Sequence, residues 1–197
     1  MKIKIVLFLS ILFCLSCTER DIKLPKQRGY FRIDFPERTY YSFEKKEFPY
    51  FLKLPNYSEV TIDSSKTAEP FWINIQYPKF NATIHISYKH IQHNLTDFVD
   101  DAHFLAYKHD VKAEAIKTEE FHYPDKDVHG LLFDIKGNAA SVKQFVITDS
   151  LTHFIRGALY FNVPPNKDSL APVISFMHED IVNLISTFKW NPQFSYK

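Results

Sequence analysis

Histidines are the residues of this sequence best suited to chemistry near neutral pH, because imidazole titrates there. The chain has nine of them. His85, His90, His103 and His109 lie in one region, which raises the possibility of a metal-binding or hydrolytic site. His103 and His109 are six residues apart, however, and six residues turn a helix by ~600°, so the two side chains would point to different faces. The spacing therefore gives no ready-made metal site.

Catalytic motifs are absent from the sequence. His178, Glu179 and Asp180 begin like the His-Glu-x-x-His motif of zinc hydrolases, but Val182 stands where the second histidine belongs. No Gly-x-Ser-x-Gly elbow and no glycine-rich phosphate loop occurs. We therefore expect no catalytic residue, no metal and no cofactor. A cell-wall-binding module or hydrolase that uses the histidine-rich region is the alternative hypothesis.

Cys17 is the second candidate for chemistry, this time a covalent modification. Lys2 and Lys4 precede an apolar run that ends at Leu15, as in an export signal. The run is about half of the roughly 20 residues that a membrane-spanning helix needs. Leu15 and Ser16 before Cys17 resemble a lipobox, in which the cysteine sulfur receives a diacylglyceryl group. Cys17 is thus the predicted lipidation site.

Lipidation at Cys17 implies a division of the chain. We expect residues 1–16 to be a lipoprotein signal peptide and residues 17–28 to be a polar, lipid-anchored tether. Two or more acyl chains give stable anchoring, so the membrane is an expected partner. Removing two lysines with the signal peptide takes the formal net charge from +1 to slightly negative. Nucleic acid is not an expected partner, because binding to it requires a basic surface.

The remaining residues, 29–197, are expected to fold as a single domain. Alternating apolar residues predict strands, as at Ile73, Ile75 and Tyr77. The four residues after Tyr77 fit a hairpin connection to the next alternating run. The predicted strands span residues 30–35, 48–54, 59–62, 71–77, 82–88, 115–123, 129–136, 142–148 and 154–163.

Two segments change from a period of two residues to a helical period. Leu95, Phe98 and Ala102 begin an amphipathic pattern that continues to about residue 113. A second pattern follows Pro164 and Pro165. The order of strands, helix, strands and helix predicts an α+β fold, with a mostly antiparallel sheet covered by two amphipathic helices. A Mog1/PsbP-like sandwich has a comparable element order.

Two stretches mix polar and aromatic residues in a way that suggests a partner-binding face. One begins at Arg28, and the other runs from Asn138 into two adjacent predicted strands. The alternative is a polar outer sheet face with cross-strand pairs such as Asp149 with Arg156. The candidate residues of the partner-binding face are Arg28, Tyr30, Arg32, Asp34, Asn138, Ser141, Gln144, Asp149, His153 and Arg156.

The same stretches carry a family resemblance. The segments PKQRGYFRIDFPE, FNATIHISYK, DDAHFLAYKHDVKAEAI and NAASVKQFVITDSLTHFIRGALYF, with a C-terminal TFKW, resemble the gliding motility lipoprotein GldD of the Bacteroidota. The resemblance runs from about Leu24 to Trp190. It implies an envelope lipoprotein required for gliding and for the associated type IX secretion machinery, with other envelope proteins of these systems as partners. It implies no known reaction. An accessory, assembly or scaffold role in the outer membrane, facing the periplasm, is the function we expect.

Overall fold

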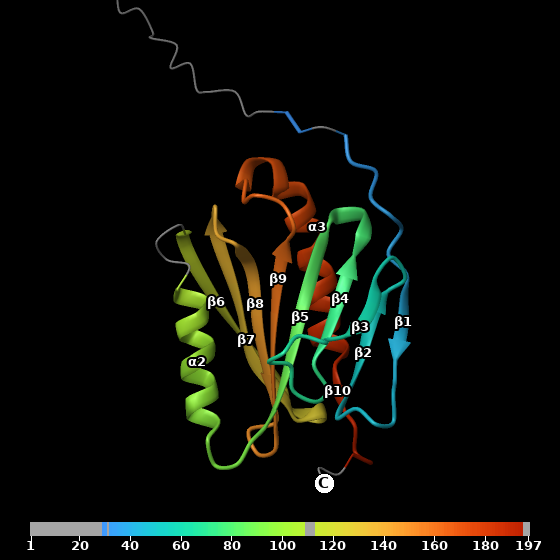
Figure 1. Cartoon of the computed structure of the whole chain (residues 1–197), viewed down its shortest axis with the longest axis vertical. Coiled ribbons are helices and arrows are strands. Elements are labelled where there is room, and N and C mark those ends of the chain that lie inside the picture. Colours follow the sequence, from blue (N-terminus) through green and yellow to red (C-terminus); the bar gives the residue numbers. More distant parts are fainter. Residues whose placement is uncertain (1–28, 31, 109–112, 195–197) are drawn as a thin grey trace, which may run out of the picture. The chain divides into compact units, whose positions relative to one another are not determined.

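The computed structural model describes residues 29, 30, 32–108 and 113–194 (Figure 1). The predicted signal peptide and tether, including Cys17, lie outside these residues. The chain divides into two units, Met1–Arg32 and Ile33–Lys197. Gly29, Tyr30 and Arg32 are the described residues of the first unit. All helices and strands given below belong to the second.

The second unit combines ten strands, two α-helices and two short 3₁₀ turns among its described residues. In chain order these are β1 (Tyr40–Phe43), β2 (Tyr50–Pro55), β3 (Glu59–Ile62), β4 (Ile73–Tyr77), η1 (Pro78–Phe80), β5 (Ala82–His90), α2 (Leu95–Tyr107), β6 (Ala113–Tyr123), η2 (Pro124–Lys126), β7 (Val128–Gly137), β8 (Ser141–Thr148), β9 (His153–Phe161), α3 (Lys167–Thr187) and β10 (Lys189–Trp190). The predicted α+β class is confirmed.

Seven strands form an antiparallel sheet in the order β3-β4-β5-β9-β8-β7-β6. The predicted hairpin joins β4 to β5 through η1, where Asn81 adopts the left-handed conformation that asparagine tolerates. A smaller antiparallel sheet has the order β1-β2-β10. The pairing of β5 with β9 brings the two halves of the sequence together in the middle of the large sheet.

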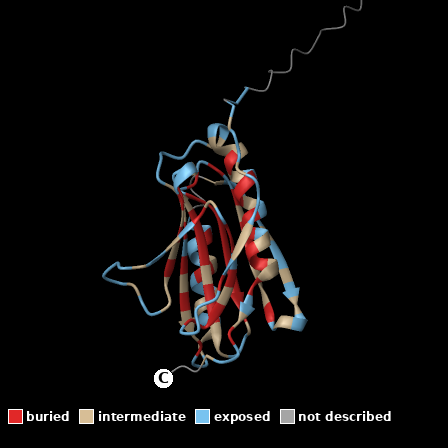
Figure 2. Ribbon diagram, turned by 90° about the vertical axis from the view of Figure 1, so that its right-hand side faces the viewer, coloured by how far each residue is buried: buried red, intermediate tan, exposed pale blue. Residues whose placement is uncertain are grey.

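The main core lies between the large sheet and a layer made of α3 and the small sheet. On β4, Ile73, Ile75 and Tyr77 are fully or almost fully buried, as the alternation predicts. The predicted apolar stripe of α3 faces them, with Met177 and Ile181 fully buried. Figure 2 shows the buried residues gathered on the sheet and on the side of α3 that faces it. Burying apolar surface at about 25 cal/mol per Å² is what holds these layers together.

Helix α2 packs on the opposite face of the large sheet. Ala102 lies in a buried cluster with Val146 of β8 and Phe154 of β9, and Ala106 packs with Phe133 of β7. The small alanine side chains let the helix lie close to the strands. Two smaller cores therefore fix α2 over β7, β8 and β9 (Figure 1).

The chain enters the folded unit through a segment without backbone pairing to a strand, residues 33–39, which we call the entry segment. It is held by side chains: Ile33 packs on the main core, and the ring of Phe35 stacks on Phe176 of α3 with centroids 4.5 Å apart. Arg38 donates a hydrogen bond to the Phe176 carbonyl at 3.1 Å and lies over the Phe176 ring. The entry segment is thus fastened mainly to α3.

Some element boundaries differ from those predicted. The described residues between 30 and 35 form no strand, because this part of the chain is anchored by ring packing rather than by a ladder of hydrogen bonds. Instead β1 begins at Tyr40, and β10 adds two residues to the small sheet. Helix α2 ends at Tyr107, earlier than the apolar pattern suggests.

Candidate functional site

One half of the large sheet's α2 face carries polar and aromatic side chains, and no helix of the described residues packs on it. Strand alternation places these side chains opposite the main core, since their neighbours in sequence are the buried residues of β4, β5 and β9. We call this surface the open half. It consists of Asn74, Thr83, His85, Ser87, Arg156 and Tyr160.

His85 connects three strands of the open half. Its Nδ1 lies 2.6 Å from Oδ1 of Asn74 on β4, and its ring meets that of Tyr160 on β9 edge to face, with centroids 5.6 Å apart. Burial lowers the pKa of His85, and nearby Asp63 offsets part of this effect. A neutral His85 donates from Nδ1 to Asn74, which leaves Nε2 as an acceptor.

Arg156 lies at the border between the open half and the part of the sheet under α2. In register, Ser87 of β5 lies on one side of it and Val146 of β8 on the other. Its guanidinium donates to Oε1 of Gln144 at 2.5 Å. Burial lowers the pKa of Arg156, and Tyr160 partly offsets the effect. Nε of Arg156 and Nε2 of Gln144 are buried, and neither has a hydrogen-bond partner among the described residues.

The other candidates from the second polar stretch have local roles. Asn138 accepts a hydrogen bond from the backbone N–H of Lys167, and Ser141 is fully buried. Oδ1 of Asp149 accepts hydrogen bonds from three backbone N–H groups of the β8–β9 turn. Asp149 does not lie opposite Arg156, whose register partner is Val146. The structure therefore groups Gln144 with Arg156 and places Asn138, Ser141 and Asp149 elsewhere.

His153 belongs to a ring cluster at the start of β9. Its Nδ1 lies 2.7 Å from the hydroxyl of Tyr88, and its ring stacks on Trp190 with centroids 4.9 Å apart. Burial lowers the pKa of His153. These contacts tie the C-terminal strand β10 to the large sheet, which is a packing role.

The N-terminal candidates are separated from this site in the chain. Arg28 lies outside the described residues, and Tyr30 and Arg32 belong to the first unit. Asp34 is an exposed residue of the entry segment. Their place in a common face with Gln144 and Arg156 remains a prediction.

The histidine-rich region does not converge on one point in the described residues. His85 and His90 belong to β5, whereas His103 belongs to α2 and packs edge to face on Phe133. His109 lies outside the described residues. Within the described ranges, no group of three or more His, Cys, Asp or Glu side chains could hold a metal ion.

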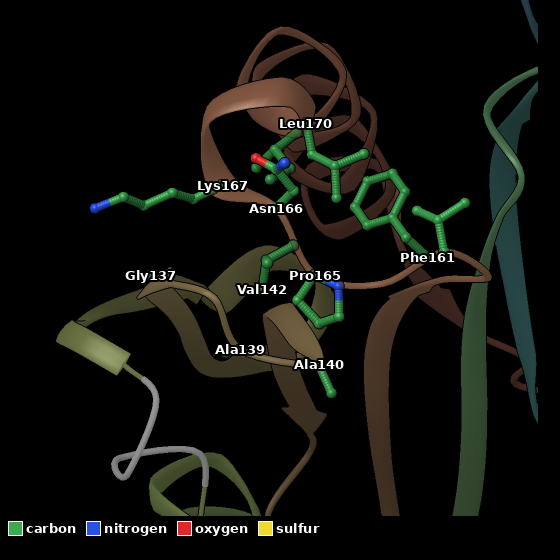
Figure 3. Close-up of a pocket in the computed structure, with 11 residues that line it drawn as sticks. Gly137, Ala139, Ala140, Val142, Phe161, Pro165, Asn166, Lys167 and Leu170 are labelled. Carbon is green, nitrogen blue, oxygen red and sulfur yellow. The ribbon is translucent and has the colours of Figure 1, made fainter.

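Two hollows lie elsewhere on the described residues. One, of about 10 Å³, holds about one water molecule and lies where the loop after β7 meets the start of α3. Figure 3 shows the residues that line it. Lys167 extends away from it (Figure 3). A wider, open hollow of about 450 Å³ lies on β6 and β7 and includes His122 and His129. Neither combines several convergent polar groups with an enclosed apolar volume, as small-molecule sites usually do.

A buried carboxylate that the sequence analysis missed lies between α3 and the small sheet. The side chain of Asp180 is fully buried and accepts hydrogen bonds from the hydroxyls of Tyr40 and Tyr57. Arg38 lies 3.7 Å from it and also pairs with Glu179 at 3.3 Å. Burial raises the pKa of Asp180, while the bonds from Tyr57 and Tyr40 and the charge of Arg38 oppose that rise. A signal was present, because Asp180 falls on the buried stripe of α3.

Comparison with known proteins decides the family. The sequence matches the family model of the gliding motility lipoprotein GldD over residues 20–190. The chain belongs to the GldD family. Membership associates it with gliding motility and, as a lipoprotein, with the cell envelope. None of the described helices has the length and apolar character needed to span a bilayer.

Structural comparison of this GldD-family chain returned the solution structure of cyanobacterial PsbP (CyanoP) from Synechocystis sp. PCC 6803. The TM-score is 0.48 at 12% sequence identity, with 79% of this chain and 94% of that chain covered. No curated protein matches the chain significantly. The family assignment therefore rests on the GldD model.

Proposed function

We propose that this GldD-family lipoprotein is a non-enzymatic accessory component of the gliding apparatus and of the associated type IX secretion machinery. Cys17 anchors it to the outer membrane, residues 17–28 form the tether, and the folded unit contacts other envelope proteins from the periplasmic side. The observation that carries the proposal is the open half. It is a polar and aromatic sheet surface that no described helix packs on, next to strands that α2 covers.

The composition of the open half suits a protein partner. Aromatic residues and arginine are enriched in protein interfaces, where they combine apolar contact with directional hydrogen bonds. Tyr160 and Arg156 supply these groups, and His85 and Asn74 hold each other in place. Because the side chains project from paired strands, the backbone beneath them is already ordered before binding, so no backbone entropy has to be lost there.

The test uses the full-length protein expressed in its own cells in place of the wild type. His85→Arg adds charge and bulk to the open half, whereas Ser42→Arg makes the matched change at an exposed position of β1. We expect His85→Arg to remain membrane-anchored but to lose colony spreading, secretion of type IX cargo and crosslinked envelope partners. Ser42→Arg should behave as the wild type does.

The anchor is tested separately with Cys17→Ala. We expect this variant to lose its acyl group, as seen by intact mass, together with its membrane retention and its support of spreading. Normal spreading of a stably produced His85→Arg variant with unchanged crosslinks would rule out the open half as the partner surface. Retention of mature Cys17→Ala protein in the membrane would rule out the anchor.

A further inference from the structure

Arg156 is a cation without a carboxylate partner. Among the described residues, no Asp or Glu forms an ion pair with it. Lys89, on the same face of β5, is by contrast paired with Glu69. A partly buried charge normally gains a partner, because it has lost part of its hydration. The open half therefore presents one uncompensated positive charge.

Gln144 has no charge with which to neutralise Arg156, but its side chain forms a hydrogen bond with the guanidinium. The residue is 1% exposed, and its Oε1 accepts from the guanidinium of Arg156. The opposite amide orientation would bring two donors together, so the oxygen must face Arg156. Nε2 of Gln144 is then left as a buried donor without a partner, as is Nε of Arg156. Leaving buried donors unpaired is unfavourable.

The number of charges on the open half indicates which kind of acceptor would bind to Arg156. Burial lowers the pKa of His85, so near neutral pH its imidazole adds no charge, and Arg156 is the one cation of the open half. A carboxylate brings a single negative charge and two oxygens that match the guanidinium fork. A phosphate monoester carries about −1.5 to −2 and would remain undercompensated. Tyr160 is the other neighbour of Arg156, and its ring packs on His85.

We propose that Arg156 and Gln144 form a docking site for one carboxylate, supplied by an aspartate or glutamate side chain of a partner protein. This inference rests on the proposed function and names the chemistry by which the open half recognises its partner. The partner's carboxylate completes the ion pair that the folded chain leaves open.

The experiment is an NMR titration of the mature, lipidated protein in nanodiscs, with ¹⁵N-labelled arginine and glutamine. N-Acetylglutamate is the probe, and N-acetylglutamine is its neutral, isosteric control. We expect the Nε–H signal of Arg156 and the side-chain amide of Gln144 to shift saturably with the acid alone, and less so as salt is added. The absence of a shift, or equal shifts with both compounds, would overturn the proposal.

Two further probes separate the sources of the negative charge. Inorganic phosphate tests the charge argument, and glucuronate tests a carboxylate from a sugar. A response to phosphate that exceeds the response to N-acetylglutamate would overturn the carboxylate assignment. A response to glucuronate without one to N-acetylglutamate would overturn the protein source.

Gln144→Glu is the decisive variant. It preserves the shape of the side chain and supplies an internal carboxylate to Arg156, so affinity for N-acetylglutamate should fall at least about tenfold while the fold is retained. Lys53→Gln, which removes an exposed cation from β2, should leave the titration unchanged. Undiminished binding in Gln144→Glu would refute the site. A failed titration in a chain whose His85→Arg variant still abolishes spreading would remove the carboxylate site but leave the proposed function standing.

Discussion

The hydroxyl of Tyr57 lies 2.9 and 2.7 Å from the two carboxylate oxygens of Asp180, although 123 residues separate them in sequence. Tyr57 comes just after β2 of the small sheet, and Asp180 belongs to α3. The contact therefore joins the small sheet to α3, the two parts of the layer that covers the main core. Tyr40 donates to the same carboxylate from β1 at 3.1 Å. These hydrogen bonds lie inside an otherwise apolar layer and fix the position of α3 relative to the small sheet.

Removing the Tyr57 hydroxyl should destabilise the fold. In Tyr57→Phe the buried carboxylate of Asp180 loses a donor to both of its oxygens, and we expect a loss of about 1–3 kcal/mol in the free energy of unfolding. Urea denaturation measures it. Tyr107→Phe, at an exposed position of α2, is the control and should change little. A wild-type unfolding midpoint for Tyr57→Phe would contradict the importance of this bond.

Alkaline pH should weaken the same network. Burial, followed by the charge of Asp180, raises the pKa of Tyr40 from its ordinary value of 10.0 to about 12. Because the folded-state pKa is the higher one, the stabilisation from Tyr40 is fully present below pH 10 and is lost as the pH rises toward 12. The stability difference between wild type and Tyr40→Phe should therefore shrink across this window in urea titrations. A difference that stays constant up to pH 12 would argue against the shift.

Gly157 should not tolerate a side chain. It lies opposite Phe145 in the β8–β9 pair, and a Cβ at Gly157 would overlap the Phe145 ring. We expect Gly157→Ala to cost about 1–3 kcal/mol through overpacking, measured by thermal and urea unfolding. The double variant Gly157→Ala/Phe145→Leu should recover part of the loss. Gly29→Ala is the control, since nothing lies within 4 Å of a Cβ there.

The β8–β9 turn should depend on one oxygen atom. Oδ1 of Asp149 accepts from the backbone N–H groups of Leu151, Thr152 and His153 at 3.0, 2.9 and 2.8 Å. Asp149→Ala removes all three bonds and should lower the free energy of unfolding by about 1–2 kcal/mol. Asp149→Asn retains the oxygen and should lose much less. Equal losses in the two variants would show that the charge, and not the acceptor geometry, stabilises the turn.

Local periodicity was sufficient to predict most of the large sheet. Ile73, Ile75 and Tyr77 alternate cleanly because one face of β4 meets the core, and the helical stripe through Met177 and Ile181 predicted α3 for the same reason. Strand β1, Tyr40–Phe43, was missed because apolar and polar residues do not alternate along it, and Tyr40 and Tyr41 are both half-buried. Its partner β2 was predicted from the apolar run bounded by Pro49 and Pro55.

Of the residues predicted for the partner-binding face, the structure brings together those on neighbouring strands of the sheet, whereas their function as a site stays a prediction. Gln144 and Arg156 could be grouped because a short turn joins their strands. Tyr40, Tyr57 and Asp180 meet only after the whole chain has folded, so no local pattern links them. The alternative interpretation, a polar outer sheet face, paired Asp149 with Arg156, but the hairpin register places Asp149 at the turn, where backbone N–H groups bind it.

The attachment of the entry segment to α3 has a mechanical meaning. Tension arriving along the chain at Ile33 would first load the stacked rings of Phe35 and Phe176 and the contacts of Arg38, before any strand of the large sheet. Because these contacts hold α3 by its side, the tension would be distributed over the core residues that pack beneath the helix. The large sheet, which carries the open half, would then keep its shape while the chain before Ile33 is under tension. That arrangement would separate the residues that bear the tension from the open half, the surface that we propose as the partner-binding site.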